Sequence, residues 1–321
     1  MANILLTTYC NRMCKYCFAQ GKVDLGQQQG DSSKNLSMEN LEKIIEYYKH
    51  NHLERFVILG GEPTLHPNFS NMVDRVLKEK AFSAVIVFTN GIMPDNVLDY
   101  LSNNKDRRLD VALNLNSEDS YSSTEWKKVN NTMRVIGPRI GVGINIYHSG
   151  QDYDYLIEAI NTYQMRSHIR AGLTHPIHGG KNKYAQLEDY PGIAEDLIVF
   201  AEKVFKNNIT FSFDCGFPFC MFTLDQHKEL LRFGIQFRSL CTPIVDVGPN
   251  LDIWRCFPML KDVQGKLTDF ESRKQIIDLF NNKYKNIQKM GNFLDCPQCI
   301  YRKNKMCSGG CLARTIDSFH R

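Results

Sequence analysis

Three cysteines lie within eight residues near the start of the chain. Cys10, Cys14 and Cys17 occupy the stretch YCNRMCKYCF, directly after the apolar run Ile4-Leu5-Leu6. A structural metal site closes its coordination sphere with protein ligands, whereas a catalytic site leaves one position open. Three thiolates can hold three irons of a cubane [4Fe–4S] cluster and leave the fourth iron free for another ligand. The spacing C-x3-C-x2-C therefore predicts an iron–sulfur site with an open iron.

The remaining cysteines are unevenly distributed over the 321 residues. Of the 11 cysteines, three lie within residues 10–17, none in the next 197 residues, and eight within residues 215–311. Disulfides are disfavoured in a reducing compartment, and an odd number of cysteines cannot be fully paired. Clustering of this kind favours metal ligation over scattered core thiols.

Composition excludes several classes of protein. No run of 18 apolar residues exists, so we expect no membrane span. The N-terminus lacks the cationic start and long apolar stretch of a signal peptide, which predicts a cytoplasmic location. The formal net charge of +4 is too small to indicate a nucleic-acid partner.

Apolar runs of strand length alternate with helix-like stretches over about the first two thirds of the chain. Seven runs are expected to form strands, at residues 3–7, 55–59, 84–89, 109–116, 141–147, 168–174 and 209–214. Between them, apolar residues recur at helical spacing, the first such set following an N-cap candidate, Ser37. Strict β/α alternation predicts parallel strands joined by right-handed crossovers. We therefore expect an α/β fold with a partial (β/α)6 barrel.

The expected strands also predict what lies inside the barrel. Val111 and Leu113 fall on one face of their strand, and Asn114 and Asn116 fall on the other. The later strands repeat this alternation, so the lumen would be lined with amides, hydroxyls and charged groups. Buried polar groups need partners, which favours a polar ligand or ordered water in the lumen. The alternative is a set of half-exposed antiparallel strands.

The alternation stops after residue 214. A short helix is expected at 223–233, a hairpin turning at Gly248-Pro249-Asn250, a helix near 271–289, and then a cysteine-rich tail. We predict two domains, a barrel at 1–218 and a small cysteine-rich domain at 219–321.

Two motifs together resemble a known family, the radical S-adenosylmethionine (AdoMet) enzymes. Its signature C-x3-C-x-φ-C, with an aromatic φ, matches the Cys10–Cys17 loop with Tyr16 as φ, and its GGE motif matches Gly60-Gly61-Glu62 after the second expected strand. The resemblance implies that the three thiolates hold a catalytic [4Fe–4S] cluster. It further implies that Gly60, Gly61 and Glu62 hold the methionyl amino group of AdoMet, since glycines allow close backbone approach.

The resemblance implies further AdoMet contacts at the ends of later strands. Asn90 closes the third strand, Asn116 and Ser117 end the fourth, and Arg170 on the sixth is a candidate partner of the AdoMet carboxylate. The alternative for these side chains is hydrogen bonding within the lumen. The implied reaction is reductive cleavage of AdoMet to a 5′-deoxyadenosyl radical, which abstracts hydrogen from a substrate.

The C-terminal cysteines resemble the SPASM/twitch extension of this family, which binds one or two auxiliary [4Fe–4S] clusters. The match implies one set of Cys241, Cys256 and Cys311, and a second set of Cys296, Cys299 and Cys307. The family's cysteine before Cys241 is missing, with Cys215 or Cys220 as possible substitutes, and the one after Cys311 is absent. One auxiliary cluster instead of two, or a structural zinc knuckle, are the alternatives.

Cys215 has three possible roles. It follows the last expected strand, where a thiol could donate hydrogen to a substrate radical, as in radical epimerases. It could also be a cluster ligand or a plain buried cysteine.

The resemblance favours a peptide substrate, because SPASM/twitch enzymes mostly modify peptides by crosslinking, oxidation or epimerisation. The first strand begins at residue 3, so we expect no N-terminal recognition domain, and a ribosomally made peptide would bind directly or through a separate recognition protein. The electron donor would be a flavodoxin or ferredoxin. The alternatives are a radical dehydrogenase or epimerase of a small molecule such as a sugar, and a non-enzymatic zinc or iron–sulfur regulator.

Overall fold

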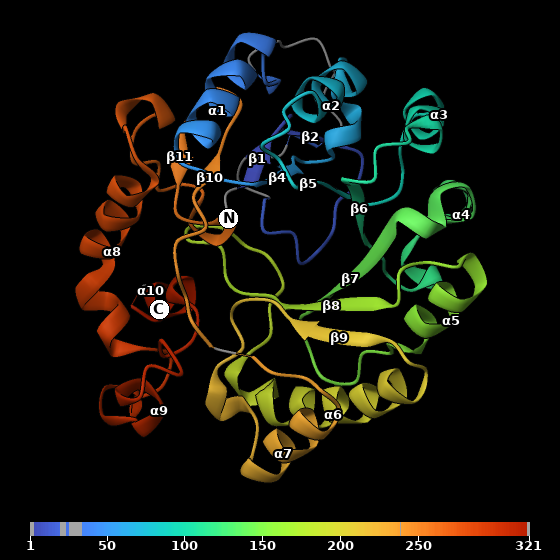
Figure 1. The fold of residues 1–321 in the computed structure, drawn as a ribbon. Helices are drawn as coiled ribbons and strands as arrows, with labels where there is room; N and C mark the ends of the chain where they lie inside the picture. Colours follow the sequence, from blue (N-terminus) through green and yellow to red (C-terminus); the bar gives the residue numbers. More distant parts are fainter. Residues whose placement is uncertain (1–2, 20–23, 26–33, 238, 320–321) are drawn as a thin grey trace.

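A nine-stranded sheet, ordered β11-β10-β1-β4-β5-β6-β7-β8-β9, curves through the centre of the molecule (Figure 1). The computed structural model describes residues 3–19, 24–25, 34–237 and 239–319. The seven expected strands correspond to β1 (Asn3–Leu5), β4 (Arg55–Leu59), β5 (Ala84–Thr89), β6 (Leu109–Asn114), β7 (Ile140–Ile146), β8 (His168–Leu173) and β9 (Thr210–Phe213). All neighbours from β1 to β9 are parallel. In the described part of the chain no pairing joins β9 to β11, so the predicted partial barrel is confirmed.

Helices lie between successive parallel strands and form the outer layer (Figure 1). They are α1 (Met38–His50), α2 (Phe69–Leu77), α3 (Asp95–Asn103), α4 (Ser123–Ile136), α5 (Asp154–Tyr163) and α6 (Tyr190–Lys206). The expected N-cap is confirmed, because the Ser37 side chain accepts a hydrogen bond from the Asn40 N–H at 3.0 Å. Leu41 and Ile44 of α1 are completely buried against the sheet.

The two faces of the inner strands differ as predicted. On β6, Val111 and Leu113 are buried, whereas Ala112 and Asn114 are partly accessible. The apolar face packs against the helices and the polar face lines the inside of the curved sheet. The half-exposed antiparallel alternative is wrong, because these strands are parallel.

The C-terminal third extends the barrel sheet at its β1 edge. The expected hairpin forms from β10 (Asp246–Val247) and β11 (Ile253–Trp254), and β10 pairs in parallel with β1 through Val247 and Ile4. The other elements are the short pair β2 (Tyr9–Cys10) and β3 (Asp24–Leu25), with α7 (Leu224–Arg232), α8 (Arg273–Met290), α9 (Ile300–Lys303) and α10 (Leu312–Ser318). Helices α8 to α10 gather on the β11 side of the molecule, opposite α3 to α5 (Figure 1). The domain boundary at 218/219 stays a prediction.

No helix within the described ranges is long and apolar enough to cross a membrane.

One buried carboxyl group on β10 makes stability depend on pH. Asp246 is fully buried and accepts a hydrogen bond from the Asn3 side chain at 2.8 Å. Burial raises its pKa to about 8. The folded protein therefore favours the protonated carboxyl. As a result, the unfolding free energy falls as pH rises towards 8.

We expect the variant Asp246→Asn to lose this pH dependence. Each unit of pKa difference corresponds to about 1.4 kcal/mol, so the wild-type unfolding free energy should fall by several kcal/mol between about pH 4 and about pH 8 relative to the variant. Denaturant unfolding of both proteins at several pH values measures the difference. Parallel curves for the two proteins would contradict the assignment.

Candidate active site

The three N-terminal cysteines lie on one loop at the C-terminal end of β1. Cys10 is the last residue of β2, and the Cys17 N–H donates to the Cys14 carbonyl at 3.1 Å, closing a tight turn. The pKa of the Cys10 thiol is raised to about 12, mainly by burial, with smaller contributions from charge repulsion by Glu62, Cys17 and Cys14. The loop thus gathers the three thiols where barrel enzymes place their chemistry.

The grouped thiols suit a cubane better than a single ion. Nowhere in the described ranges do three His, Cys, Asp or Glu side chains lie close enough to hold one metal ion. A cubane takes one thiolate per iron, so its ligands need not converge on a single point. The cysteine loop meets this requirement.

The Gly-Gly pair after β4 allows the cysteine loop to approach the sheet. The Gly61 N–H donates to the Thr7 carbonyl at 2.9 Å. A Cβ on Gly61 would lie 2.3 Å from the Tyr9 oxygen and 2.9 Å from the Cys10 Cβ, and one on Gly60 would lie 2.7 Å from the Thr7 oxygen. Both positions therefore need glycine so that the cysteine loop can approach the sheet. This structural reason was not apparent from the sequence. Their contact with AdoMet stays a prediction.

Glu62 is buried and fully engaged by the protein. Its Oε1 accepts hydrogen bonds from the hydroxyls of Thr64 and Thr89 at 2.6 and 2.8 Å, and its Oε2 accepts from the Asn90 N–H at 2.7 Å. Burial raises the pKa of this carboxyl, and the hydrogen bonds oppose the rise. The carboxylate thus joins the end of β4 to the end of β5. In this structure Glu62 positions the ends of β4 and β5. Its expected contact with the methionyl amino group of AdoMet stays a prediction.

The variant Glu62→Gln tests this role. An amide offers one acceptor where the carboxylate offers two, so at least one of the donors from Thr64, Thr89 or Asn90 loses its partner. A buried donor left unsatisfied costs about 1–3 kcal/mol. We expect the unfolding free energy to fall by that amount and AdoMet binding to weaken, as measured by denaturant unfolding and calorimetry. A variant with wild-type stability but weakened AdoMet binding would instead favour direct contact.

The other end of the cysteine loop is fixed to β6 and β7. The Tyr16 hydroxyl donates to the Asn116 Oδ1 at 2.7 Å, and its ring stacks on Tyr147 with centroids 5.6 Å apart. The Arg12 guanidinium lies 4.0 Å from the centre of the Tyr121 ring. Asn116, expected to contact AdoMet, thus holds the loop in this structure. The contact between Arg12 and Tyr121 was not predicted from the sequence, although a charged residue inside the cysteine loop could have indicated such a contact.

The Arg170 side chain lies in the polar lumen, where it contacts residues of β5 and β6 and the residue after β9. Its guanidinium forms an ion pair with Asp214, lies 3.4 Å from the Asn114 Oδ1, and covers the Phe88 ring at 4.8 Å. In this structure Arg170 therefore bonds to other residues within the lumen, which is the alternative that the sequence left open. A contact of Arg170 with the AdoMet carboxylate stays a prediction and would require Asp214 to share it.

The remaining predicted AdoMet residues lie in different places. Asn90 faces the cysteine loop, since its Nδ2 donates to the Asn11 Oδ1 at 2.9 Å and lies 4.0 Å from the Cys10 sulfur. The Ser117 hydroxyl instead donates to Asp119 in its own turn. The structure thus brings Asn90, but not Ser117, to the cysteine loop.

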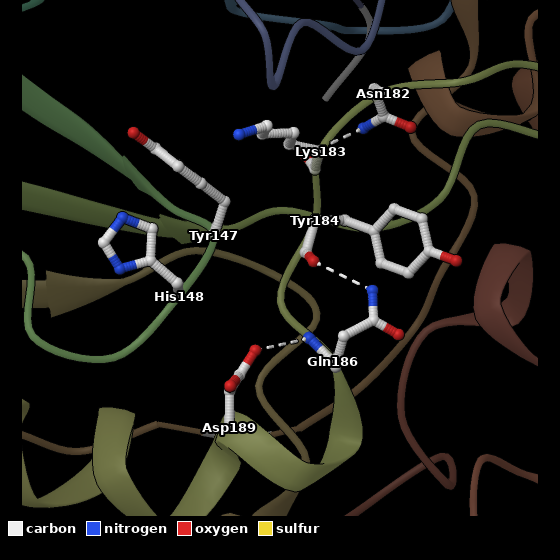
Figure 2. Close-up of a pocket in the computed structure, with 7 residues that line it drawn as sticks. All are labelled: Tyr147, His148, Asn182, Lys183, Tyr184, Gln186 and Asp189. Carbon is white, nitrogen blue, oxygen red and sulfur yellow. Dashed lines mark hydrogen bonds between the residues drawn. The ribbon is translucent and has the colours of Figure 1, made fainter.

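A polar pocket of about 410 Å³ opens beside the loop (Figure 2). It is lined by Tyr147, His148, Asn182, Lys183, Tyr184, Gln186 and Asp189. The Lys183 N–H donates to the Lys15 carbonyl at 2.8 Å, so the pocket wall and the cysteine loop are in direct contact. Tyr147, which stacks on Tyr16, forms the opposite wall (Figure 2). This recess is the candidate substrate pocket.

The C-terminal cysteines fall into two neighbourhoods. Burial raises the pKa of the Cys256 thiol, and the nearest thiols that add to the rise are Cys241 and Cys311. In the other neighbourhood, the Gly309 N–H donates to the Cys307 sulfur at 3.2 Å, and the Cys296 sulfur lies 3.9 Å from the Gly309 carbonyl. This grouping agrees with the two sets that the resemblance implied, with Cys299 at the end of the turn that begins at Cys296. Cluster binding by either set stays a prediction.

Comparison with known proteins identifies the family. A model of the Radical SAM superfamily matches residues 4–182, which is more than half of the chain. The chain belongs to the radical SAM superfamily. Membership implies a [4Fe–4S] cluster and AdoMet as cofactors. The grouped thiols of the cysteine loop, with the glycine motif packed directly against them, fit that requirement.

Curated relatives share only part of the chain. A GTP 3′,8-cyclase from Synechocystis sp. is 31% identical over 130 residues, which is 40% of this radical SAM chain and 38% of the cyclase. A protein of Methanocaldococcus jannaschii, named as a glycyl-radical enzyme activating enzyme, is 36% identical over 98 residues, or 30% of this chain and 34% of the relative. The chain thus spans little more than a third of either relative.

Solved structures match over nearly the full length. Streptococcus suis SuiB bound to S-adenosylmethionine has a TM-score of 0.66 and 16% identity, covering 98% of this chain and 73% of SuiB. The structure of native anSMEcpe with bound AdoMet also has a TM-score of 0.66 and 16% identity, covering 100% of this chain and 95% of anSMEcpe. At these identities the similarity shows the fold alone.

Proposed function

We propose that this radical SAM protein cleaves AdoMet reductively and abstracts hydrogen from a ribosomally made peptide, which it crosslinks, oxidises or epimerises. The observation that carries the proposal is the extent of the fold match. SuiB bound to its precursor peptide SuiA matches over 98% of this chain, and anSMEcpe with the Kp18Cys peptide matches over 97%. The match therefore extends beyond the residues 4–182 matched by the family model and into the C-terminal cysteine-rich part.

The residues of the cysteine loop would hold the catalytic cluster. When bound there by Cys10, Cys14 and Cys17, a [4Fe–4S] cluster supplies the electron that splits AdoMet into methionine and a 5′-deoxyadenosyl radical. Glu62 keeps the loop-facing Asn90 in position, while Tyr16 and Arg12 fix the loop over the lumen. The polar pocket beside the loop would orient the peptide and exclude water from the radical. A flavodoxin or ferredoxin would supply the electron.

The C-terminal cysteines would hold auxiliary clusters of the SPASM/twitch type. The sets Cys241–Cys256–Cys311 and Cys296–Cys299–Cys307 fit, because each combines buried and partly accessible cysteines rather than freely exposed ones. The Gly309 N–H also donates to the Cys307 sulfur at 3.2 Å, as expected for a thiolate ligand. The zinc alternative is tested by metal analysis below.

A small-molecule substrate is the second candidate. It is favoured by the sequence similarity to GTP 3′,8-cyclases, one of which is 31% identical over 130 residues. The similarity covers 38% of that cyclase, however, so it leaves the substrate open.

Metal and product analysis after anaerobic reconstitution tests the proposal. We expect about twelve irons per chain, no stoichiometric zinc, and formation of 5′-deoxyadenosine with dithionite and AdoMet. A peptide encoded beside this gene should then change mass, and deuterium from the modified position should appear in 5′-deoxyadenosine. Deuterium transfer from a nucleotide or sugar instead would favour the second candidate. Stoichiometric zinc without deoxyadenosine would refute an enzymatic role.

A further inference from the structure

We propose that each C-terminal set of three cysteines is completed by one cysteine from the segment that follows β9. The first set is then Cys241, Cys256, Cys311 and Cys215, and the second is Cys296, Cys299, Cys307 and Cys220. The inference rests on the proposed function, because it assumes that the C-terminal sets bind iron–sulfur clusters. Each auxiliary cluster would then have four protein thiolates, one for each iron. The N-terminal cluster would be the one that keeps an open iron.

Aromatic packing brings Cys215 to the first set. Phe213, two residues before Cys215, packs its ring on Phe237 with centroids 5.1 Å apart. Four residues after Phe237 the chain reaches Cys241. The end of β9 is thereby in contact with the segment that leads to Cys241.

The other two members of the first set are tied to Cys241 by hydrogen bonds. The Arg255 guanidinium donates to the Cys241 carbonyl at 2.8 Å, which places the adjacent Cys256 beside it. The Cys241 N–H donates to the Ser308 hydroxyl at 3.0 Å, three residues before Cys311. Three chain segments and the β9 turn therefore meet at one place.

A different set of contacts brings Cys220 to the second set. Cys220 is the middle residue of the short helical turn Phe219–Met221. The Phe219 ring packs on Tyr301 with centroids 4.5 Å apart, and Tyr301 lies between Cys299 and Cys307 in the chain. The Phe219 ring also packs on Phe237, at the longer centroid distance of 5.9 Å. Of its ring contacts with the two cysteine-bearing segments, the closer one is therefore to the segment that carries the second set.

A buried imidazole marks the site next to Cys215. His175 is 2% exposed, and neither of its ring nitrogens has a hydrogen-bond partner. A Cβ on Gly216 would lie 2.0 Å from its Nε2, so the turn that carries Cys215 rests on this ring. Buried polar groups are normally paired, so the orphaned imidazole indicates that a polar group belongs beside it. A cluster held by Cys215 would supply that neighbour, and His175 is also the rival ligand.

The assignment changes the expected role of Cys215. A thiol gives its proton to solvent when it binds iron, and the resulting thiolate has no S–H hydrogen to donate. Cys215 would therefore be a metal ligand, and the hydrogen-donor role considered from the sequence would belong to another group or to none.

Iron analysis in a background without the N-terminal cluster tests the assignment. The full-length variant with Cys10, Cys14 and Cys17 replaced by alanine should retain about eight irons after reconstitution. Adding Cys215→Ser or Cys220→Ser should each remove up to about four irons, or leave a cluster whose freed iron binds added cyanide. Iron content and electron paramagnetic resonance of the reduced protein, with and without cyanide, measure this directly. Gel filtration and circular dichroism verify that each variant is folded.

The two serine variants also serve as matched controls for each other. In a background that also carries Cys256→Ser, which disrupts the first set, Cys215→Ser should have no further effect, whereas Cys220→Ser should still act. With Cys299→Ser the pattern should reverse. Additive effects of Cys215→Ser with Cys256→Ser would overturn the pairing.

The outcomes separate this inference from the proposed function. About eight irons in the background, with spectra that Cys215→Ser and Cys220→Ser leave unchanged and insensitive to cyanide, would overturn the inference alone. Loss of the first cluster's signal on His175→Gln but not on Cys215→Ser would give the ligand role to the imidazole. A background protein without iron would refute the auxiliary clusters, and with them both proposals.

Discussion

Replacement of Cys14 by alanine is expected to reduce AdoMet cleavage to background. The loop brings three thiols together at the end of β1, and each would hold one iron of the catalytic cluster. With one thiolate removed, two ligands remain, and the site can no longer keep a cubane with a single open iron. The measurement is 5′-deoxyadenosine formation under dithionite, together with iron content after reconstitution. Iron should fall by up to about four per chain, because the C-terminal sets are unaffected.

The adjacent residue offers a matched control. Met13 precedes Cys14 on the same loop, and its side chain is 79% exposed. The variant Met13→Ala should keep wild-type iron content and AdoMet cleavage, because no packing or ligand is lost. Deoxyadenosine formation by Cys14→Ala at the wild-type rate would contradict the assignment of the loop as the catalytic site.

The variant Gly61→Ala is expected to displace the cysteine loop. The added methyl group would lie 2.3 Å from the Tyr9 oxygen and 2.9 Å from the Cys10 Cβ, so the loop must move away from β4. Overpacking of this kind costs about 1–3 kcal/mol in unfolding free energy. Because Cys10 moves with the loop, we also expect loss of cluster binding, beyond the loss of stability. Thermal unfolding and iron content measure the two effects separately.

The same substitution in β7 provides the control for Gly61→Ala. A Cβ on Gly141 would meet no atom within 4 Å, so Gly141→Ala adds a methyl group without a clash. This variant should unfold at or near the wild-type temperature and bind the full amount of iron. If Gly61→Ala behaved like Gly141→Ala, the glycine pair would not be needed for approach of the loop.

Both predictions reflect how the cysteine loop is held. On one side, the loop packs on Gly60 and Gly61, and the neighbouring Glu62 binds the end of β5. On the other side, Tyr16 and Arg12 attach it to β6 and the residues that follow. Rigid support from two strands is what a site needs to keep its ligands in productive geometry.

The barrel and the cysteine loop could be predicted from the sequence alone. Strands such as Arg55–Leu59 and Ala84–Thr89 lie where the β-rich runs predicted them, and α1 begins after the N-cap Ser37. These features depend on local periodicity and capping, which neighbouring residues specify. The spacing of Cys10, Cys14 and Cys17 is likewise local, because a short loop can present closely spaced thiols only to one place.

Contacts between residues far apart in the chain are seen only in the tertiary structure. It packs Gly61 against Tyr9 and Cys10, and it directs the carboxylate of Glu62 to Thr89 and Asn90. It also pairs β10 with β1 across more than 240 residues, so the C-terminal hairpin extends the barrel sheet. Neither periodicity nor spacing encodes such contacts, because they arise when separate elements pack on a common core.

The C-terminal cysteines show the same difference between what local spacing predicts and what tertiary contacts specify. Their number and spacing indicated metal ligation, and the resemblance suggested two sets of three. The fourth members could not be read from spacing, because Cys215 and Cys220 are only five residues apart and either could have joined either set. Phe213 packs on Phe237 at 5.1 Å, whereas Phe219 packs more closely on Tyr301, at 4.5 Å, than on Phe237, at 5.9 Å. The proposed assignment of the two thiols to different sets rests on this packing between distant segments, which no local pattern specifies.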